Sequence, residues 1–264
     1  MSSIVSFAVP TATSAPTGAT NTYLVGSRGS ILVDPAGRTP ALDRAVDERS
    51  VDHLLVTHTH PDHVGAVAEY AATTGATLWA HSRYRDRFER ATGVEPDRTF
   101  ADGDEVVSGD GTRVVVVETP GHAPDHLAFV VGESALVGDL AMAEGSVLVG
   151  DDGDLSAYLT SLDRLLALAP SRCYPGHGPP IEEPEPTLSR LIDHRRERER
   201  RVLAAVRSGC ETVDAIVDSA YEKDLSGLEE LAAQAVRAHV RKLASEGEIE
   251  WDGGCARTVD SRDR

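Results

Sequence analysis

Short apolar runs alternate with helical patterns along the first two thirds of the chain. Turn residues bound seven runs that predict strands, at residues 22–25, 31–33, 54–56, 77–79, 113–117, 127–131 and 135–137. Helical periodicity predicts a helix over 64–72 that Gly75 ends, and another over 155–168 that stops before Pro170. This alternation predicts an α/β fold.

The pattern changes at Pro179–Pro186, a segment with the sequence PPIEEPEP. Four prolines in eight residues disfavour a helix, so we expect a domain boundary here. The predicted domains are therefore 1–186, the catalytic domain, and 187–264. The second part predicts one long helix over 188–206, shorter helices near 213–219 and 228–245, and a short β-hairpin at 247–251. Helices followed by a terminal hairpin suggest a winged-helix module.

Charge is unevenly distributed along the 264 residues. The chain carries 43 Asp and Glu against 26 Lys and Arg, a net charge of -17, and only Lys223 and Lys242 are lysines. An acidic, lysine-poor surface suits a halophilic protein that stays dissolved in a saline cytoplasm, and it argues against a polyanionic partner. The exception is the segment 188–208, where seven arginines face Asp193, Glu197 and Glu199.

Other features of the composition argue against several classes of protein. No run approaches the ~18 apolar residues of a membrane span, so we expect no membrane partner. The N-terminus has no basic segment followed by an apolar one, so we expect no secretory signal. The three cysteines, Cys173, Cys210 and Cys255, lie far apart. They predict neither a disulfide framework nor a thiolate zinc site, and they suit a cytoplasmic location.

Histidines recur in three short motifs, each directly after a predicted strand. The motifs are Thr57-His58-Thr59-His60-Pro61-Asp62-His63, Thr119-Pro120-Gly121-His122 and Pro175-Gly176-His177-Gly178. Asp139 follows another predicted strand in the same way. Because an α/β fold gathers the C-terminal ends of its strands at one rim, we expect these side chains to lie close together.

The spacing predicts two metal ions. Alternation at a strand end lets His58 and His60 reach one ion, and the turn at Pro61 directs the next two side chains toward a second ion. The predicted ligands are His58, His60 and His122 for the first ion, Asp62, His63 and His177 for the second, and Asp139 as a bridge. Imidazole and carboxylate ligands without thiolates favour Zn²⁺, with Mn²⁺ or Fe²⁺ as alternatives.

This set of motifs resembles the metallo-β-lactamase superfamily, which implies an αββα sandwich with a metal site at one edge. The resemblance gives His58, His60, Asp62, His63, His122, Asp139 and His177 the roles of metal ligands. Asp139 stands where the best-known secreted β-lactamases use a cysteine. Only 37 residues separate Asp139 from His177, so the β-CASP insert of RNA-processing members is absent.

Further segments resemble the beta-lactamase-like protein type 2 subfamily. They are Gly18–Gly26, Thr119–His126, Tyr158–Leu162, Pro175–Pro179 and His194–Glu199. The subfamily has a C-terminal winged-helix-like segment, in agreement with the interpretation of 187–264. It includes a mitochondrial single-strand-specific endoribonuclease and fungal thioesterases that act on acyl carrier proteins, so the resemblance implies the fold and metal site better than the substrate.

The predicted chemistry is hydrolysis by a hydroxide that bridges two zinc ions. Asp62 is the predicted residue that orients the nucleophile and accepts its proton. His126 is a candidate for proton delivery or for support of a ligand, although a structural role is at least as expected. His81 is a further candidate for support of the site, and His53 and His239 are expected to be structural.

Three functions remain open. A single-strand endoribonuclease or other phosphodiesterase is narrowly favoured, with Arg195 and Arg196 as phosphate-binding residues. The alternative is a hydrolase of acyl thioesters similar to glyoxalase II, in which case the arginine-rich helix is a solvated face with a Glu197–Arg201 pair. A non-catalytic nucleic-acid binder is disfavoured by the complete ligand set. The sequence leaves the oligomeric state open, with a dimer as one possibility.

Overall fold

The first sheet has six strands that lie side by side in sequence order. In the computed structural model, which describes residues 4–221 and 225–259, these strands are β1 (Ile4–Pro10), β2 (Ala19–Val25), β3 (Ser30–Val33), β4 (Val51–Leu55), β5 (Thr77–His81) and β6 (Arg98–Phe100). Pairs from β1 to β3 are antiparallel, and pairs from β3 to β6 are parallel. Because successive side chains point to opposite faces, Leu24 packs on the helical side while Tyr23 and Val25 face the second sheet.

The second sheet has five strands in the spatial order β11-β10-β9-β8-β7. They are β7 (Glu105–Val107), β8 (Arg113–Glu118), β9 (Leu127–Val131), β10 (Ser134–Gly138) and β11 (Arg172–Pro175). Only the β10–β11 pair is parallel among the described pairs of this sheet. Val116, Phe129 and Leu136 pack against residues of the first sheet and form the core between the sheets.

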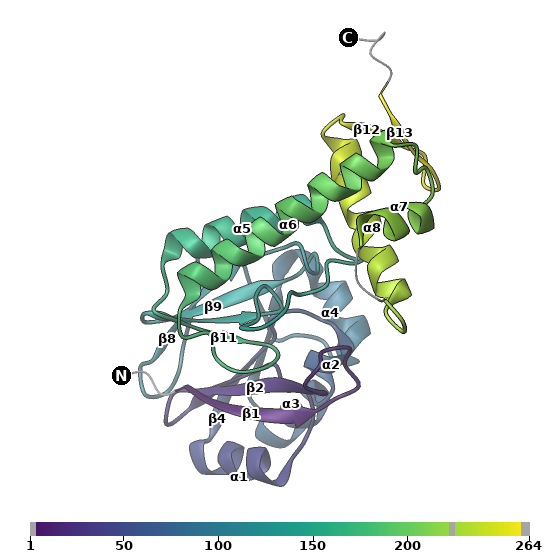
Figure 1. The fold of residues 1–264 in the computed structure, drawn as a ribbon. Helices are drawn as coiled ribbons and strands as arrows, with labels where there is room; N and C mark the ends of the chain where they lie inside the picture. The colour runs from purple at the N-terminus through teal and green to yellow at the C-terminus, as the bar shows by residue number, and fades with distance from the viewer. Residues whose placement is uncertain (1–3, 222–224, 260–264) are drawn as a thin grey trace.

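Helices cover the outer face of each sheet (Figure 1). On the first sheet lie α1 (Pro40–Arg49), α3 (Val67–Thr74) and α4 (Arg85–Thr92), preceded by the short α2 (Pro61–Val64) and the 3-10 turn η1 (Ser82–Tyr84). On the second lie α5 (Leu155–Leu168) and the first half of α6 (Pro184–Arg207). The predicted αββα sandwich is therefore confirmed. No helix in the described ranges is long and apolar enough to cross a membrane.

Two predicted helix boundaries are wrong. The helix expected over 64–72 is divided into α2 and α3, because the Ala66 N–H donates to the Pro35 carbonyl in the loop after β3 and not to a carbonyl of its own helix. Gly75 does end α3, in a left-handed conformation with φ of 66°. The segment Pro179–Pro186, predicted to be free of helix, contains the start of a helix, because α6 begins at Pro184. Prolines are tolerated in a first turn, where the backbone N–H groups have no partner within the helix.

The last third of the chain forms a separate hydrophobic cluster. The second half of α6 packs with α7 (Val213–Ala220), α8 (Glu229–Ser245) and the two-stranded sheet of β12 (Ile249–Trp251) and β13 (Ala256–Thr258). The hairpin expected at 247–251 is thus only its first strand. The boundary predicted after residue 186 falls in the first turn of α6, a helix that contributes to both clusters. The winged-helix interpretation stays a prediction.

Candidate metal centre

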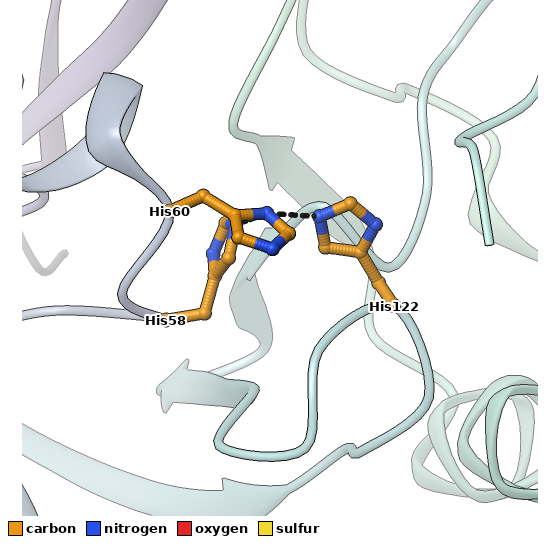
Figure 2. Close-up of side chains that lie close together, drawn as sticks. All are labelled: His58, His60 and His122. Carbon is orange, nitrogen blue, oxygen red and sulfur yellow. Dashed lines mark hydrogen bonds between the residues drawn. The ribbon is translucent and has the colours of Figure 1, made fainter. Parts of the chain in front are cut away.

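Three imidazoles converge at the ends of β4 and β8. The Nδ1 atom of His60 lies 3.0 Å from His58 Nε2 and 2.9 Å from His122 Nε2. Figure 2 shows the three rings directed toward one another, with His58 and His60 on one side and His122 on the other. His58 and His60 lie between the end of β4 and Pro61, the first residue of α2, and this short segment brings the two side chains together. Three nitrogen ligands around one point are what the sequence predicts for the first ion.

A second group lies beside the first. Asp62, His63 and His177 can each place a ligand atom within 4.8 Å of the others. The Asp139 carboxylate lies between the groups. Its Oδ1 is 3.4 Å from His63 Nε2, and its Oδ2 is 3.5 Å from His122 Nε2 and 3.4 Å from His177 Nε2. The structure therefore brings all seven predicted ligands together, with Asp139 in the position expected of a bridge.

In His122 and His177, the hydrogen bond of Nδ1 determines that Nε2 points into the site. Nδ1 of His122 donates to the Leu148 carbonyl at 2.7 Å, and Nδ1 of His177 donates to the Ala19 carbonyl at 2.8 Å. A carbonyl oxygen can only accept, so Nδ1 carries the proton in both rings. In the neutral imidazole, Nε2 then has a lone pair directed into the site. This is the tautomer that a metal ion requires.

The sequence interpretation missed Asp34. This carboxylate is 1% exposed, accepts hydrogen bonds from Thr57 N–H and Thr57 Oγ1, and lies 2.9 Å from His63 Nδ1. It therefore orients His63 and ties β3 to the start of the first motif. The available signal was its place directly after the strand 31–33, the same position that Asp139 has after its own strand.

Burial and charge act against each other at the two groups. Burial alone lowers the pKa of an imidazole, but hydrogen bonds to Asp139 and Asp62 outweigh it and raise the pKa of His177 to about 10. Burial opposes ionisation of Asp62, but His177 and His63 outweigh that effect and lower its pKa to about 2. In the first group, burial and neighbouring imidazoles hold the pKa of His58 well below its usual range. Ionised carboxylates beside a neutral imidazole ligand favour a bound cation.

Two further observations fit a metal ion. His63 Nε2 and Asp139 Oδ1 are buried and have no hydrogen-bond partner among the described residues. Unpartnered buried polar atoms are costly, and a shared cation would satisfy both. Next to them, a Cβ atom on Gly176 would lie 2.4 Å from Asp139 Oδ1 and 2.7 Å from His63 Cε1. Glycine at 176 therefore keeps open the space in which the ligand atoms meet.

Comparison with known proteins identifies the family. Residues 15–177 match the family model described as the metallo-beta-lactamase superfamily. The chain belongs to the metallo-beta-lactamase superfamily. It is a member of a superfamily of metal-dependent hydrolases, and its His and Asp groups are able to hold a metal.

Several relatives match this chain over most of its length. The beta-lactamase-like protein 2 homolog of Drosophila melanogaster is 33% identical over 87% of this chain and 84% of its own. A solved structure of the metallo-beta-lactamase family protein TTHA1429 from Thermus thermophilus is 25% identical with a TM-score of 0.77, and it covers 97% of this chain and 98% of its own. The protein TTHA1623, solved in a di-iron-bound form, is 30% identical with a TM-score of 0.53, over 72% of this chain and 97% of its own.

His126 lies behind the ligands rather than at the reacting site. It is 1% exposed, its Nε2 accepts the Asp139 backbone N–H at 3.0 Å, and its Nδ1 lies 2.9 Å from Thr119 Oγ1. Burial and the neighbouring His122 lower its pKa to about 3. Because both ring nitrogens are engaged, the proposal of proton delivery does not fit, and the alternative of support for a ligand does. His81 contacts Glu118 instead of a predicted ligand.

The arginine-rich helix is mostly not free to bind phosphates. Arg195 is 5% exposed and donates to the Val147 carbonyl, so its burial does not fit the predicted contact with RNA. Arg200 and Arg201 both pair with Glu197, as the solvated interpretation expects. Arg196 is exposed. The arginines differ in burial because one face of α6 packs on α5 and the other does not. A run of charges in the sequence does not show which face packs.

A cavity of ≈ 460 Å³ opens beside the ligands. His60, Asp62, His122, Asp139 and His177 line it, together with residues 12–16, residues 144–148, Pro61, Met142 and Leu231. Part of the loop 141–154, namely Met142 and residues 144–148, therefore forms one wall of this cavity. Glu144 adds a negative charge to this wall, and none of the described lining residues is Lys or Arg.

Proposed function

We propose that this protein hydrolyses acyl thioesters with two zinc ions held by the seven ligands. The observation that carries the proposal is the lining of the cavity beside the ligands. Pro16, Met142, Val147 and Leu148 make its wall partly apolar, and no Lys or Arg lines it among the described residues. An uncharged acyl group suits such a wall, whereas a chain of phosphates calls for cations along its path.

The chain's own groups fit this reaction. Zinc ions held by the seven predicted ligands would supply Lewis acidity, which lowers the pKa of water and offsets negative charge on a substrate oxygen. His177 and His63 lower the pKa of Asp62 to about 2, so its carboxylate remains ionised at neutral pH and can accept a hydrogen bond that orients a water molecule. The hydrogen bonds at His122 Nδ1 and His177 Nδ1 hold the rings in a fixed direction. Preorganised ligands avoid reorganisation during the reaction.

The leaving group also favours a thioester. A thiolate needs little protonation as it departs, whereas a ribose oxygen benefits from a general acid. The sequence candidate for such an acid, His126, has both nitrogens engaged inside the protein. The site as described therefore suits a substrate whose leaving group is stable as an anion.

Single-strand RNA cleavage is the second candidate. Arg196 is exposed on α6, and no described residue is paired with it. The similarity to beta-lactamase-like protein 2 homologs also supports this candidate. It needs RNA to approach a cavity edged by Glu144 on a protein of net charge -17. A non-catalytic nucleic-acid binder stays the weakest candidate, because binding alone does not require seven converging ligands.

The metal and the substrate can be tested in one experiment. Purified protein is loaded with Zn²⁺, Mn²⁺ or Fe²⁺ (the di-iron form of TTHA1623 makes iron a relevant arm) and assayed in molar KCl with an acyl thioester and single-stranded RNA side by side. A His58→Ala variant is the control. The proposal predicts thioester hydrolysis that the variant loses, highest with zinc. RNA cleavage that the variant loses, with the thioester left intact, would overturn it.

A further inference from the structure

A groove between α6 and α8 adjoins the cavity of the metal centre. It has a volume of ≈ 360 Å³ and is lined by one side of α6, by residues 146–148 and by the first half of α8. Ser146, Val147, Leu148 and Leu231 line both spaces. A substrate longer than the cavity therefore has the groove as a direct continuation.

The groove is positively charged in a protein that is otherwise acidic. Three side chains of α6 line it, His194, Arg195 and Arg198, and no described lining residue is Asp or Glu. Burial and the adjacent guanidinium groups lower the pKa of His194 to about 4, so the arginines supply the charge at neutral pH. Glu199, on the same helix, is held by Lys242 at 2.9 Å.

Arg198 is the cation with unused capacity. Its guanidinium lies 3.6 Å from the centre of the Tyr221 ring, and no carboxylate of a described residue is paired with it. The side chain is half-buried. The Nε of Arg195 beside it is buried without a hydrogen-bond partner among the described residues. Guanidinium groups removed from water without an anion are unfavourable, and a planar guanidinium matches a carboxylate or phosphate.

The rest of the groove is apolar. Its lining includes Leu225, Leu228, Leu231, Ala232 and Ala235. The Leu228 side chain is 51% exposed, one of three large hydrophobic residues so exposed in the part of the chain that the structure describes. An exposed leucine and an arginine that no carboxylate of a described residue pairs with line the same groove, and together they fit a ligand that has an aliphatic segment and ends in an anion.

We propose that this groove binds the tail of the substrate, and that the tail is an aliphatic chain carrying a carboxylate or a phosphate that Arg198 binds. The inference rests on the proposed thioester hydrolysis and narrows its substrate class. The scissile bond lies at the seven ligands, the aliphatic part passes Leu231, and the anion reaches Arg198. A carboxylate would belong to the acyl side and a phosphate to the thiol side of the thioester.

Pairs of thioesters that differ only in their charged group distinguish a carboxylate on the acyl side from a phosphate on the thiol side. The carboxylate arm compares the adipoyl thioester of N-acetylcysteamine with its monomethyl ester. The phosphate arm compares the hexanoyl thioesters of phosphopantetheine and pantetheine. In at least one arm, the charged member should have a kcat/KM about tenfold higher than its neutral partner. Arg198→Gln should remove that difference mainly through KM and leave the neutral compounds unchanged.

Two variants control for a folding defect. Arg198→Lys keeps the charge and should retain part of the preference. Arg200→Gln, on the same helix, changes an exposed arginine that pairs with Glu197 outside the groove lining, and it should retain all of the preference. Wild-type protein without a preference in either arm, or an equal loss by Arg198→Gln on charged and neutral compounds, would overturn the inference.

Failure of the proposed function gives a different result. In that case no thioester is hydrolysed, charged or neutral. The groove is then tested by calorimetric titration with the non-hydrolysable thioethers that correspond to the two charged compounds. Weaker binding of either thioether to Arg198→Gln than to wild type supports the groove, and equal binding of both refutes it.

Discussion

The Nδ1 atom of His63 lies 2.9 Å from the Oδ2 atom of Asp34, and both side chains are 1% exposed or less. Asp34 in turn accepts two hydrogen bonds from Thr57, the residue before His58. One buried carboxylate thus aligns a ligand of the second group and the loop that carries the first. The geometry of the predicted ligands therefore depends on a residue outside the predicted ligand set.

Replacing Asp34 should weaken metal binding without removing any ligand. We expect Asp34→Asn to lower zinc affinity by about 10-fold to 100-fold, the usual effect of losing a carboxylate partner of a ligating histidine. Competition with a chromophoric chelator measures this. Asp47→Asn, on the exposed side of α1, is the control. Equal affinity in the two variants would contradict the role of Asp34, provided that both have native circular dichroism spectra.

His126 should act through the position of Asp139. His126→Ala leaves the Asp139 N–H buried without an acceptor, a loss of about 1–3 kcal/mol in the free energy of unfolding. We also expect a fall in kcat of the metal-loaded enzyme, with an unchanged shape of its pH–rate profile. His126→Gln, which can offer an oxygen acceptor, should recover part of the stability. A pH–rate profile that loses one limb in His126→Ala would instead assign His126 to proton transfer.

Gly176 should be intolerant of a methyl group. The Cβ of Gly176→Ala would lie 2.4 Å from Asp139 Oδ1, closer than such atoms approach in folded proteins. We expect this variant to lose the second metal ion, measured as the metal content per chain after dialysis. Gly254→Ala serves as the control, because its Cβ would meet only Asp252 Oδ1 at 3.6 Å. Two retained ions in Gly176→Ala would show that the ligands meet elsewhere.

Salt should stabilise the fold. At a net charge of -17, repulsion between carboxylates opposes compaction, and concentrated KCl screens it. Thermal unfolding followed by circular dichroism should show a melting temperature that rises with KCl, most steeply between about 0.1 M and 1 M, where the screening length shortens most. NaCl should act similarly at equal concentration. A melting temperature that is unchanged or falls with KCl would contradict the interpretation of the acidic surface as an adaptation to salt.

The convergence of the seven predicted ligands was predictable because its signals are local. Four strands each end directly before a motif, and the end of a strand determines where the next side chain goes. Asp139, for example, is the first residue after β10, and His177 follows two residues after β11. The alternation of strands and helices likewise predicted an α/β fold, whereas the αββα arrangement was implied by the resemblance to the superfamily.

The roles that depend on tertiary contacts could not be predicted. His126 supports Asp139 through a backbone group 13 residues away, which no local spacing reveals. Arg195 was expected at the surface, but the packing of α6 on α5 turns it toward the Tyr158 ring, 5.3 Å away. Asp34 is a single carboxylate with no partner in its own motif. In each case the contact joins two segments that lie apart in the sequence, and no pattern within either segment indicates the other.

Zinc titration of the metal-free protein tests whether this chain is a dinuclear zinc thioesterase. Hydrolysis of the hexanoyl thioester of N-acetylcysteamine is followed while Zn²⁺ is added, with the metal content measured in parallel. We expect no hydrolysis at the start, activity that rises with zinc and saturates at two ions per chain, and no activity at any loading in His60→Ala. Full activity in the presence of excess chelator, or no thioester hydrolysis with two zinc ions bound, would contradict the proposed function.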